Sequence, residues 1–168
     1  MITIEELEGL NILLKQDQFV PTFYWTGDIA EDAELINRPH IEKEGEQENR
    51  IRETIDIINL FKDHPDFNGT IEVKDVFNIQ NWFLKQNNYK GIKSGLRDHN
   101  VMFSNALEWD GSTLNWKNIQ EYFYKVLPVN FSTKEQLLLW YTVMQKIHPL
   151  SDLNGRVFGV IVAILYKP

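Results

Sequence analysis

Residues 134–166 read KEQLLLWYTVMQKIHPLSDLNGRVFGVIVAILY, and this stretch is the strongest indication of the fold. Its apolar residues predict two helices, 134–147 and 154–166, with Thr133 as the N-cap of the first and a short loop between them. Residues 160–165 are apolar on nearly all sides, which predicts a helix that is buried all round. The N-terminal part of the chain or a partner chain has to cover this helix, unless the chain is a fragment.

Apolar residues at helical spacing predict further helices in the rest of the chain. These helices lie at about 3–16, 28–36, 50–61, 70–83 and 119–126. The fourth of them has Thr70 as its N-cap candidate. Residues 95–109 form two short runs around Ser104-Asn105, which predicts one β-hairpin. We therefore expect an all-α fold with a small β-hairpin.

The composition is that of a single globular domain. The chain has 168 residues, and at about 150 residues per domain this predicts one domain over residues 1–168. It carries 17 Lys and Arg against 24 Asp and Glu, a net charge of −7. A protein that binds nucleic acid normally has a basic face, so this acidic balance argues against a nucleic-acid partner. The absence of cysteine excludes disulfides, a cysteine nucleophile and thiolate metal sites, and fits a reducing compartment.

The sequence also argues against membrane association. The N-terminal stretch MITIEELEGL is acidic and lacks the basic and then apolar pattern of a signal peptide. The longest apolar run, 157–166, has about ten residues, whereas a transmembrane helix needs about 20. We expect a soluble, cytoplasmic protein with no membrane partner.

The loop between the last two helices holds the residues that suggest chemistry. His148 can act as a general base near neutral pH, and Asp152 offers the hard oxygen that Mg²⁺ prefers. Asn154-Gly155 at the helix start leaves backbone N–H groups accessible to an anion, and the forked donors of Arg156 suit a phosphate. Together they predict a phosphoryl or nucleotidyl transfer site. The alternative is that His-Pro only ends a helix and that Asn-Gly only makes a turn.

The segment His148-Pro-Leu-x-Asp-x-Asn-Gly-Arg156 resembles the signature of the Fic family (the Fic/Doc or Fido fold), His-Pro-Phe-x-Asp/Glu-Gly-Asn-Gly-Arg-x-x-Arg. Residues 156–167 are similar to the buried helix that follows the family motif. Residues 95–103 look like the family's flap, a hairpin that docks a target segment. Residues 33–42 are similar to the inhibitory region of many Fic proteins, which reads Ser/Thr-x-x-x-Glu-Gly/Asn.

The resemblance implies transfer of AMP from ATP to a Ser, Thr or Tyr hydroxyl of a target protein. His148 would deprotonate that hydroxyl, and Asp152 would hold Mg²⁺ against the phosphates. Asn154, Gly155 and Arg156 would cradle the phosphates, partly through backbone amides.

The resemblance also assigns roles outside the loop. The target's main chain would align on the flap by strand addition. The flap residues concerned are Arg97, Val101, Met102 and Phe103. The single Fic-like domain would divide into an N-terminal extension (1–30), an inhibitory-type helical region (about 31–61) and a Fic core (62–168), with Glu42 as the inhibitory glutamate.

The chain departs from the family signature at several positions. Leu150 replaces the phenylalanine, a swap of one apolar anchor for another. Leu153 replaces the first glycine, and its side chain disfavours a positive φ or crowds the anion site. Gly159 replaces the final arginine, which removes a charge-assisted contact worth about 1.5–3 kcal/mol. Some family members that transfer other groups also vary at this position, so the resemblance leaves room for a donor other than ATP.

The inhibitory glutamate of the family pairs with the arginine that Gly159 replaces, so Glu42 would lack that partner. A register on Glu44 fits no better, and the alternative is a solvated acidic face. Two hypotheses follow. The protein is a Fic-type nucleotidyltransferase, or it is a catalytically impaired Fic-like module that binds a nucleotide or a protein. The sequence leaves the target, the donor and the formation of a homo-oligomer open.

Overall fold

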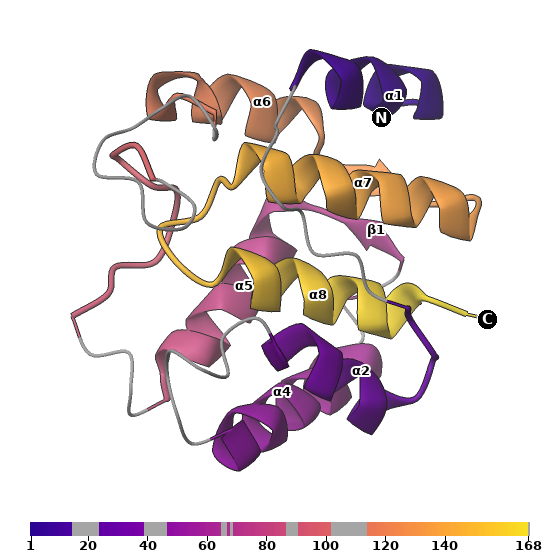
Figure 1. Cartoon of the computed structure of the whole chain (residues 1–168), viewed down its shortest axis with the longest axis vertical. Helices are drawn as coiled ribbons and strands as arrows, with labels where there is room; N and C mark the ends of the chain where they lie inside the picture. The colour runs from indigo at the N-terminus through magenta and orange to yellow at the C-terminus, as the bar shows by residue number, and fades with distance from the viewer. Residues whose placement is uncertain are drawn as a thin grey trace.

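The computed structural model describes residues 1–14, 24–38, 47–64, 67, 69–86, 91–101 and 114–167. The described helices run, in chain order, over α1 (Ile4–Leu13), α2 (Ile29–Asn37), α4 (Gln47–Lys62), α5 (Val73–Leu84), the short 3₁₀ turn η3 (Trp116–Asn118), α6 (Ile119–Lys125), α7 (Lys134–Ile147) and α8 (Asn154–Leu165). Two short strands, β1 (Thr70–Ile71) and β2 (Val129–Asn130), accompany them. The all-α class with a small antiparallel sheet is confirmed, and each predicted helix has a counterpart (Figure 1).

Helix α8 is the centre of the packed body. It contacts α7 on one side and α2, α4 and α5 on the others, and Figure 1 shows it lying between α7 and the α2–α4 pair. Its residues from Arg156 to Ala163 are buried. The expected cover for this apolar helix is therefore supplied by N-terminal segments of the same chain.

A glycine allows α2 to approach α8 closely. A Cβ atom added at Gly159 would lie 2.8 Å from Cγ1 of Ile36 on α2. That distance is shorter than any carbon–carbon van der Waals contact, so the space beside residue 159 is filled by Ile36. A glycine in a helix interior lowers helix stability by about 0.5–1 kcal/mol relative to alanine, and the close approach of α2 explains its use here.

Helix α1 packs along α7, on the side of α7 remote from α2 and α4. Thr3 begins α1 with a capping box, because its Oγ1 accepts from the Glu6 N–H at 3.1 Å and its own N–H donates to Glu6 at 3.2 Å. Lys146 near the end of α7 donates to the Asn11 side chain at 2.6 Å. Burial lowers the pKa of this lysine. The N-terminal helix is therefore attached to the turn that precedes His148.

The two-stranded sheet joins segments far apart in the chain. Thr70 pairs with Asn130 and Ile71 with Val129 in antiparallel register. Thr70 therefore lies in a strand, and α5 begins later, with Glu72 as N-cap and its N–H donating to Asp75 at 2.8 Å. The N-cap prediction for Thr70 is wrong, because its backbone is committed to the strand pair.

The hairpin predicted over 95–109 lies largely outside the described residues. In its described part, Leu96 forms an antiparallel bridge with Leu150 of the loop that follows α7. Over the described residues, no helix combines the length and apolar character needed to cross a bilayer. The division into segments 1–30, 31–61 and 62–168 stays a prediction.

Candidate active site

The loop between α7 and α8 begins and ends with a left-handed residue. His148 follows the last turn of α7 with φ 50° and ψ 57°, and Leu153 precedes α8 with φ 73° and ψ 21°. The sequence suggested that a leucine at 153 disfavours a positive φ, yet Leu153 adopts it and buries its side chain in the core. The loop conformation is therefore held by contacts with its surroundings.

Asn154 shapes this loop with its side chain. Its Oδ1 accepts from the Leu150 N–H at 2.8 Å, and its Nδ2 donates to the Leu150 carbonyl at 3.0 Å. The residue is buried, and both ends of its amide are used in these bonds. The side chain of Asn154 is therefore used within the loop. For the predicted binding of phosphate, this residue can contribute its backbone N–H at the start of α8.

The first turn of α8 has features of an anion site. Its N-cap, Leu153, makes no side-chain cap, and the turn holds no acidic residue. The N–H groups of Asn154 and Gly155 have no carbonyl within the helix to bond, and the helix dipole places positive potential there. Helices α2 and α7 differ, since Asp28 and Thr133 cap them and acidic residues follow. The start of α8 therefore suits a phosphate.

Asp152 and His148 are both half-buried in the same loop. Asp152 Oδ1 accepts from the Leu153 N–H at 2.7 Å, which directs the carboxylate beside the start of α8. His148 bonds through its backbone, its N–H donating to Met144 at 2.8 Å. Arg156 is buried in the first turn of α8. The predicted base, the predicted metal ligand and the predicted anion site therefore lie within one stretch, residues 148–156, where α7 passes into α8.

The donor set limits what metal this loop can hold. No group of three or more His, Cys, Asp or Glu side chains suited to a metal lies within the described ranges. Asp152 would therefore be the one carboxylate that this loop offers. Such a site fits Mg²⁺, which is bound by one or two carboxylates together with water and substrate phosphates.

Arg97, predicted as a flap residue that docks a target, is buried against the same loop at 3% exposure. Its guanidinium donates to the carbonyls of His148 at 2.6 Å, His99 at 3.0 Å and Ile147 at 3.2 Å, and also to that of Leu114. Burial lowers the pKa of Arg97 to about 10, so it stays charged at neutral pH. Its side chain binds the end of α7 and does not form an exposed docking surface.

Gln80 of α5 also contacts the loop, although it is not among the site residues predicted from the sequence. The residue is fully buried, on the face of α5 that holds Val76, Ile79 and Phe83. Its Nε2 donates to Ser151 Oγ at 3.1 Å and to the Asp152 carbonyl at 3.2 Å. A polar residue among the apolar positions of an amphipathic helix is the signal that could have identified it.

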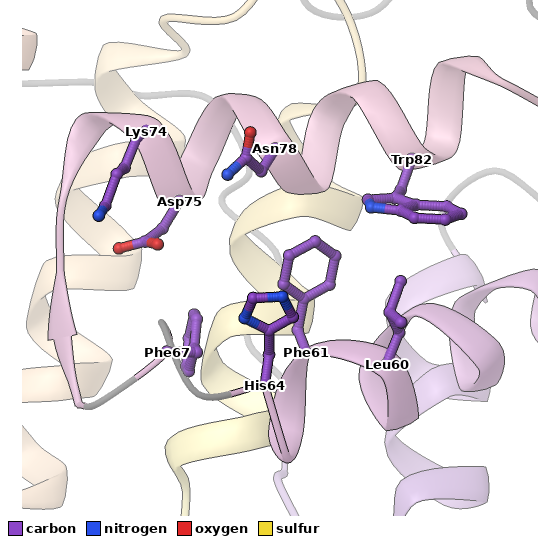
Figure 2. A pocket seen from close by; sticks show the side chains of 8 residues that line it. All are labelled: Leu60, Phe61, His64, Phe67, Lys74, Asp75, Asn78 and Trp82. Atoms are coloured by element: carbon purple, nitrogen blue, oxygen red, sulfur yellow. The ribbon is translucent and has the colours of Figure 1, made fainter.

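Two surface pockets lie along α5. The first, of about 170 Å³, lies between the end of α4 and α5 (Figure 2). It is lined by Leu60, Phe61, His64, Phe67, Lys74, Asp75, Asn78 and Trp82. The second, of about 400 Å³, is lined by Asn78, Asn81, Trp82, Leu84, Lys85, Ile92 and Ser94. Neither pocket includes a residue of the loop 148–153, although the second reaches the segment that pairs with it.

Three predicted site residues, Glu42, Met102 and Phe103, lie outside the described residues. Val101 is half-buried at the end of a described stretch.

No protein-family model, no curated protein and no solved structure matches this chain.

Proposed function

We propose that the loop 148–156 is the active site of a protein nucleotidyltransferase of the Fic type, acting in the cytoplasm. It transfers AMP from ATP, or a related nucleotide-derived group, to a Ser, Thr or Tyr hydroxyl of a target protein. The observation that carries the proposal is the first turn of α8, which has no side-chain cap and begins at Asn154, two residues after Asp152 and six residues after the half-buried His148.

Each residue has a defined task in this reaction. His148 accepts the proton of the target hydroxyl, and the hydroxyl oxygen attacks the α-phosphorus of the nucleotide. The new oxygen–phosphorus bond replaces the bond to the β-phosphate, and pyrophosphate leaves. The amides at the start of α8 and the charge of Arg156 stabilise the phosphates. Asp152 would hold Mg²⁺, and the ion would supply positive charge beside the phosphates.

Labelling tests the proposal directly. The protein is incubated with Mg²⁺, a lysate and ATP labelled at the α-phosphate, and protein-bound label is measured. We expect label with the wild type and its loss in His148→Ala. The matched control is His64→Ala, since His64 lies just after the end of α4 and outside the loop. Equal labelling by wild type and His148→Ala would refute the proposal.

One observation favours the second hypothesis, a catalytically impaired module. Ile36 fills the space beside residue 159, where the family signature has an arginine. A module of this kind would bind Mg·ATP in calorimetry, lose that binding in Asp152→Ala, and label no protein. A wild-type protein that neither labels nor binds Mg·ATP would favour a role in protein binding.

A further inference from the structure

We infer that Arg97 and Gln80 are positioning residues of the candidate active site. Their hydrogen bonds join the segment 93–99 to the loop 148–153 and fix the position of the two segments relative to each other. This inference deepens the proposed function and rests on it for its catalytic meaning. The inference is based on hydrogen bonds between described residues. These bonds do not depend on which nucleotide or which target protein the site binds.

A short backbone ladder joins the two segments. The Arg97 N–H donates to the Pro149 carbonyl at 2.9 Å, and the Ser151 N–H donates to the Gly95 carbonyl at 2.9 Å. These two bonds form the antiparallel bridge between Leu96 and Leu150. Two bonds alone make a marginal sheet, because isolated strand pairs are weak in water. The geometry therefore needs support from side chains.

Arg97 supports one end of this ladder. Its guanidinium binds the carbonyls of Ile147 and His148, which are among the last carbonyls of α7 and have no helical partner. The same group also binds carbonyls on its own side, at His99 and Leu114. The guanidinium of an arginine presents five N–H donors on three nitrogens, whereas a lysine has three donors on one nitrogen and cannot reach acceptors spread over the same distance. Arg97 thus sets the peptide orientation at His148.

Gln80 supports the other end. Its Oε1 accepts from the Gly95 N–H at 2.8 Å, while its Nε2 donates to Ser151 Oγ and to the Asp152 carbonyl. Ser151 Oγ in turn donates to the Lys93 carbonyl at 2.6 Å. One buried amide therefore bonds to both segments and to the backbone of Asp152. Because it lies on the rigid helix α5, it fixes both segments relative to the core.

The test uses two variants of the full chain, each with a control at an exposed residue of the same type. Arg97→Lys is compared with Arg52→Lys, and Gln80→Glu with Gln120→Glu, since Arg52 and Gln120 are exposed. The first readout is amide hydrogen exchange at Ser151. We expect it to rise about tenfold in both variants, as for the loss of one net hydrogen bond, and to stay unchanged in the controls.

The second readout is the ¹⁵N chemical shift of the imidazole nitrogens. The chain has four histidines, so their signals are few, and His148→Ala assigns the one of interest. In Arg97→Lys we expect the His148 shifts to move and the His64 shifts to stay. A general loss of stability would instead raise exchange throughout α7 and leave the native His148 shifts in place.

Unchanged Ser151 exchange and unchanged His148 shifts in both folded variants would overturn the inference. If either variant fails to fold, Ser151→Ala decides by the same readouts, because it removes the hydroxyl between Gln80 and Lys93 and leaves the core intact. A wild-type protein that shows this coupling but neither labels a target nor binds Mg·ATP would refute the proposed function alone.

Discussion

At the scale of single residues, the candidate site is a loop held in a costly conformation. His148 and Leu153 both have positive φ, and neither is glycine. A left-handed conformation costs a residue with a side chain about 1–2 kcal/mol, so the loop persists only because its neighbours hold it. Arg97 binds the carbonyl of His148, and the side chain of Asn154 binds the backbone of Leu150. Such strain is typical of residues whose position serves a function.

Replacing Asn154 with alanine should destabilise the protein by about 1–3 kcal/mol, because it leaves the backbone N–H and carbonyl of Leu150 without their partner. Denaturant unfolding measures the change. The control is Asn59→Ala, at an exposed position of α4. Equal stability of the two variants would show that the side chain of Asn154 does not hold the loop.

Tyr141 predicts a dependence on alkaline pH. Burial raises the pKa of its phenol above the ordinary value of about 10. Tyr141 therefore stays protonated in the folded protein while it ionises in the unfolded chain. Its contribution to stability is full below about pH 10 and falls by up to about 1.4 kcal/mol for each further pH unit.

Urea unfolding at rising pH checks this contribution. Between pH 10 and 11, Tyr141→Phe should lose less stability than the wild type, whereas the control Tyr124→Phe, at an exposed position, should behave as the wild type. Parallel stability curves for wild type and Tyr141→Phe would contradict the expectation.

At the scale of elements, the packing of α2 on α8 depends on the absence of a side chain at Gly159. Ile36 is β-branched and stiff, and three of its carbon atoms lie within 3.3 Å of the Cβ position of residue 159. This contact fills the site where the family signature places its last arginine. A larger side chain at residue 159 therefore has no room without a shift of Ile36.

Gly159→Ala should destabilise the protein by about 1–3 kcal/mol through this overpacking. In the background Ile36→Ala the same change should become neutral or stabilising, because the clash is gone. Gly9→Ala is the matched control: its Cβ would meet nothing within 4 Å, so a gain of about 0.5–1 kcal/mol is expected. The double-mutant cycle is measured by denaturant unfolding. Additive effects at positions 36 and 159 would contradict the contact.

At the scale of the whole molecule, the N-terminal helices belong to the packed body that carries the loop. Helices α2 and α4 cover α8, and α1 covers α7. The loop 148–153 lies where α7 passes into α8, so both helices that carry it are supported from the N-terminal part of the chain. The segment predicted as an N-terminal extension thus includes a helix that stabilises the site.

Leu7→Ala tests this integration. Leu7 of α1 is fully buried, so its truncation should cost about 2–5 kcal/mol. Leu13 of the same helix is 63% exposed, and Leu13→Ala should change stability little. Both are measured as shifts of the denaturant midpoint. A similar small effect for the two variants would show that α1 is not part of the cooperative unit.

Local sequence patterns are enough to predict the helices and the loop between α7 and α8. Periodic apolar residues and local caps such as Thr133 act within a few residues of each other, so a pattern can show them. It also grouped His148, Asp152 and Asn154 on one loop, because they are neighbours in the chain. Their chemical roles stay predictions.

The bonds that hold the loop and the helices that cover α8 can be seen in the folded structure but not in the sequence pattern. Gln80 and Arg97 lie about 70 and 50 residues before the groups they bind, and no local pattern encodes such pairs. The sequence pattern places Thr70 at the start of a helix for the same reason, since its strand partner, Asn130, lies far along the chain. Long-range hydrogen bonds and close packing depend on where the backbone has already gone, so they appear only in the folded molecule.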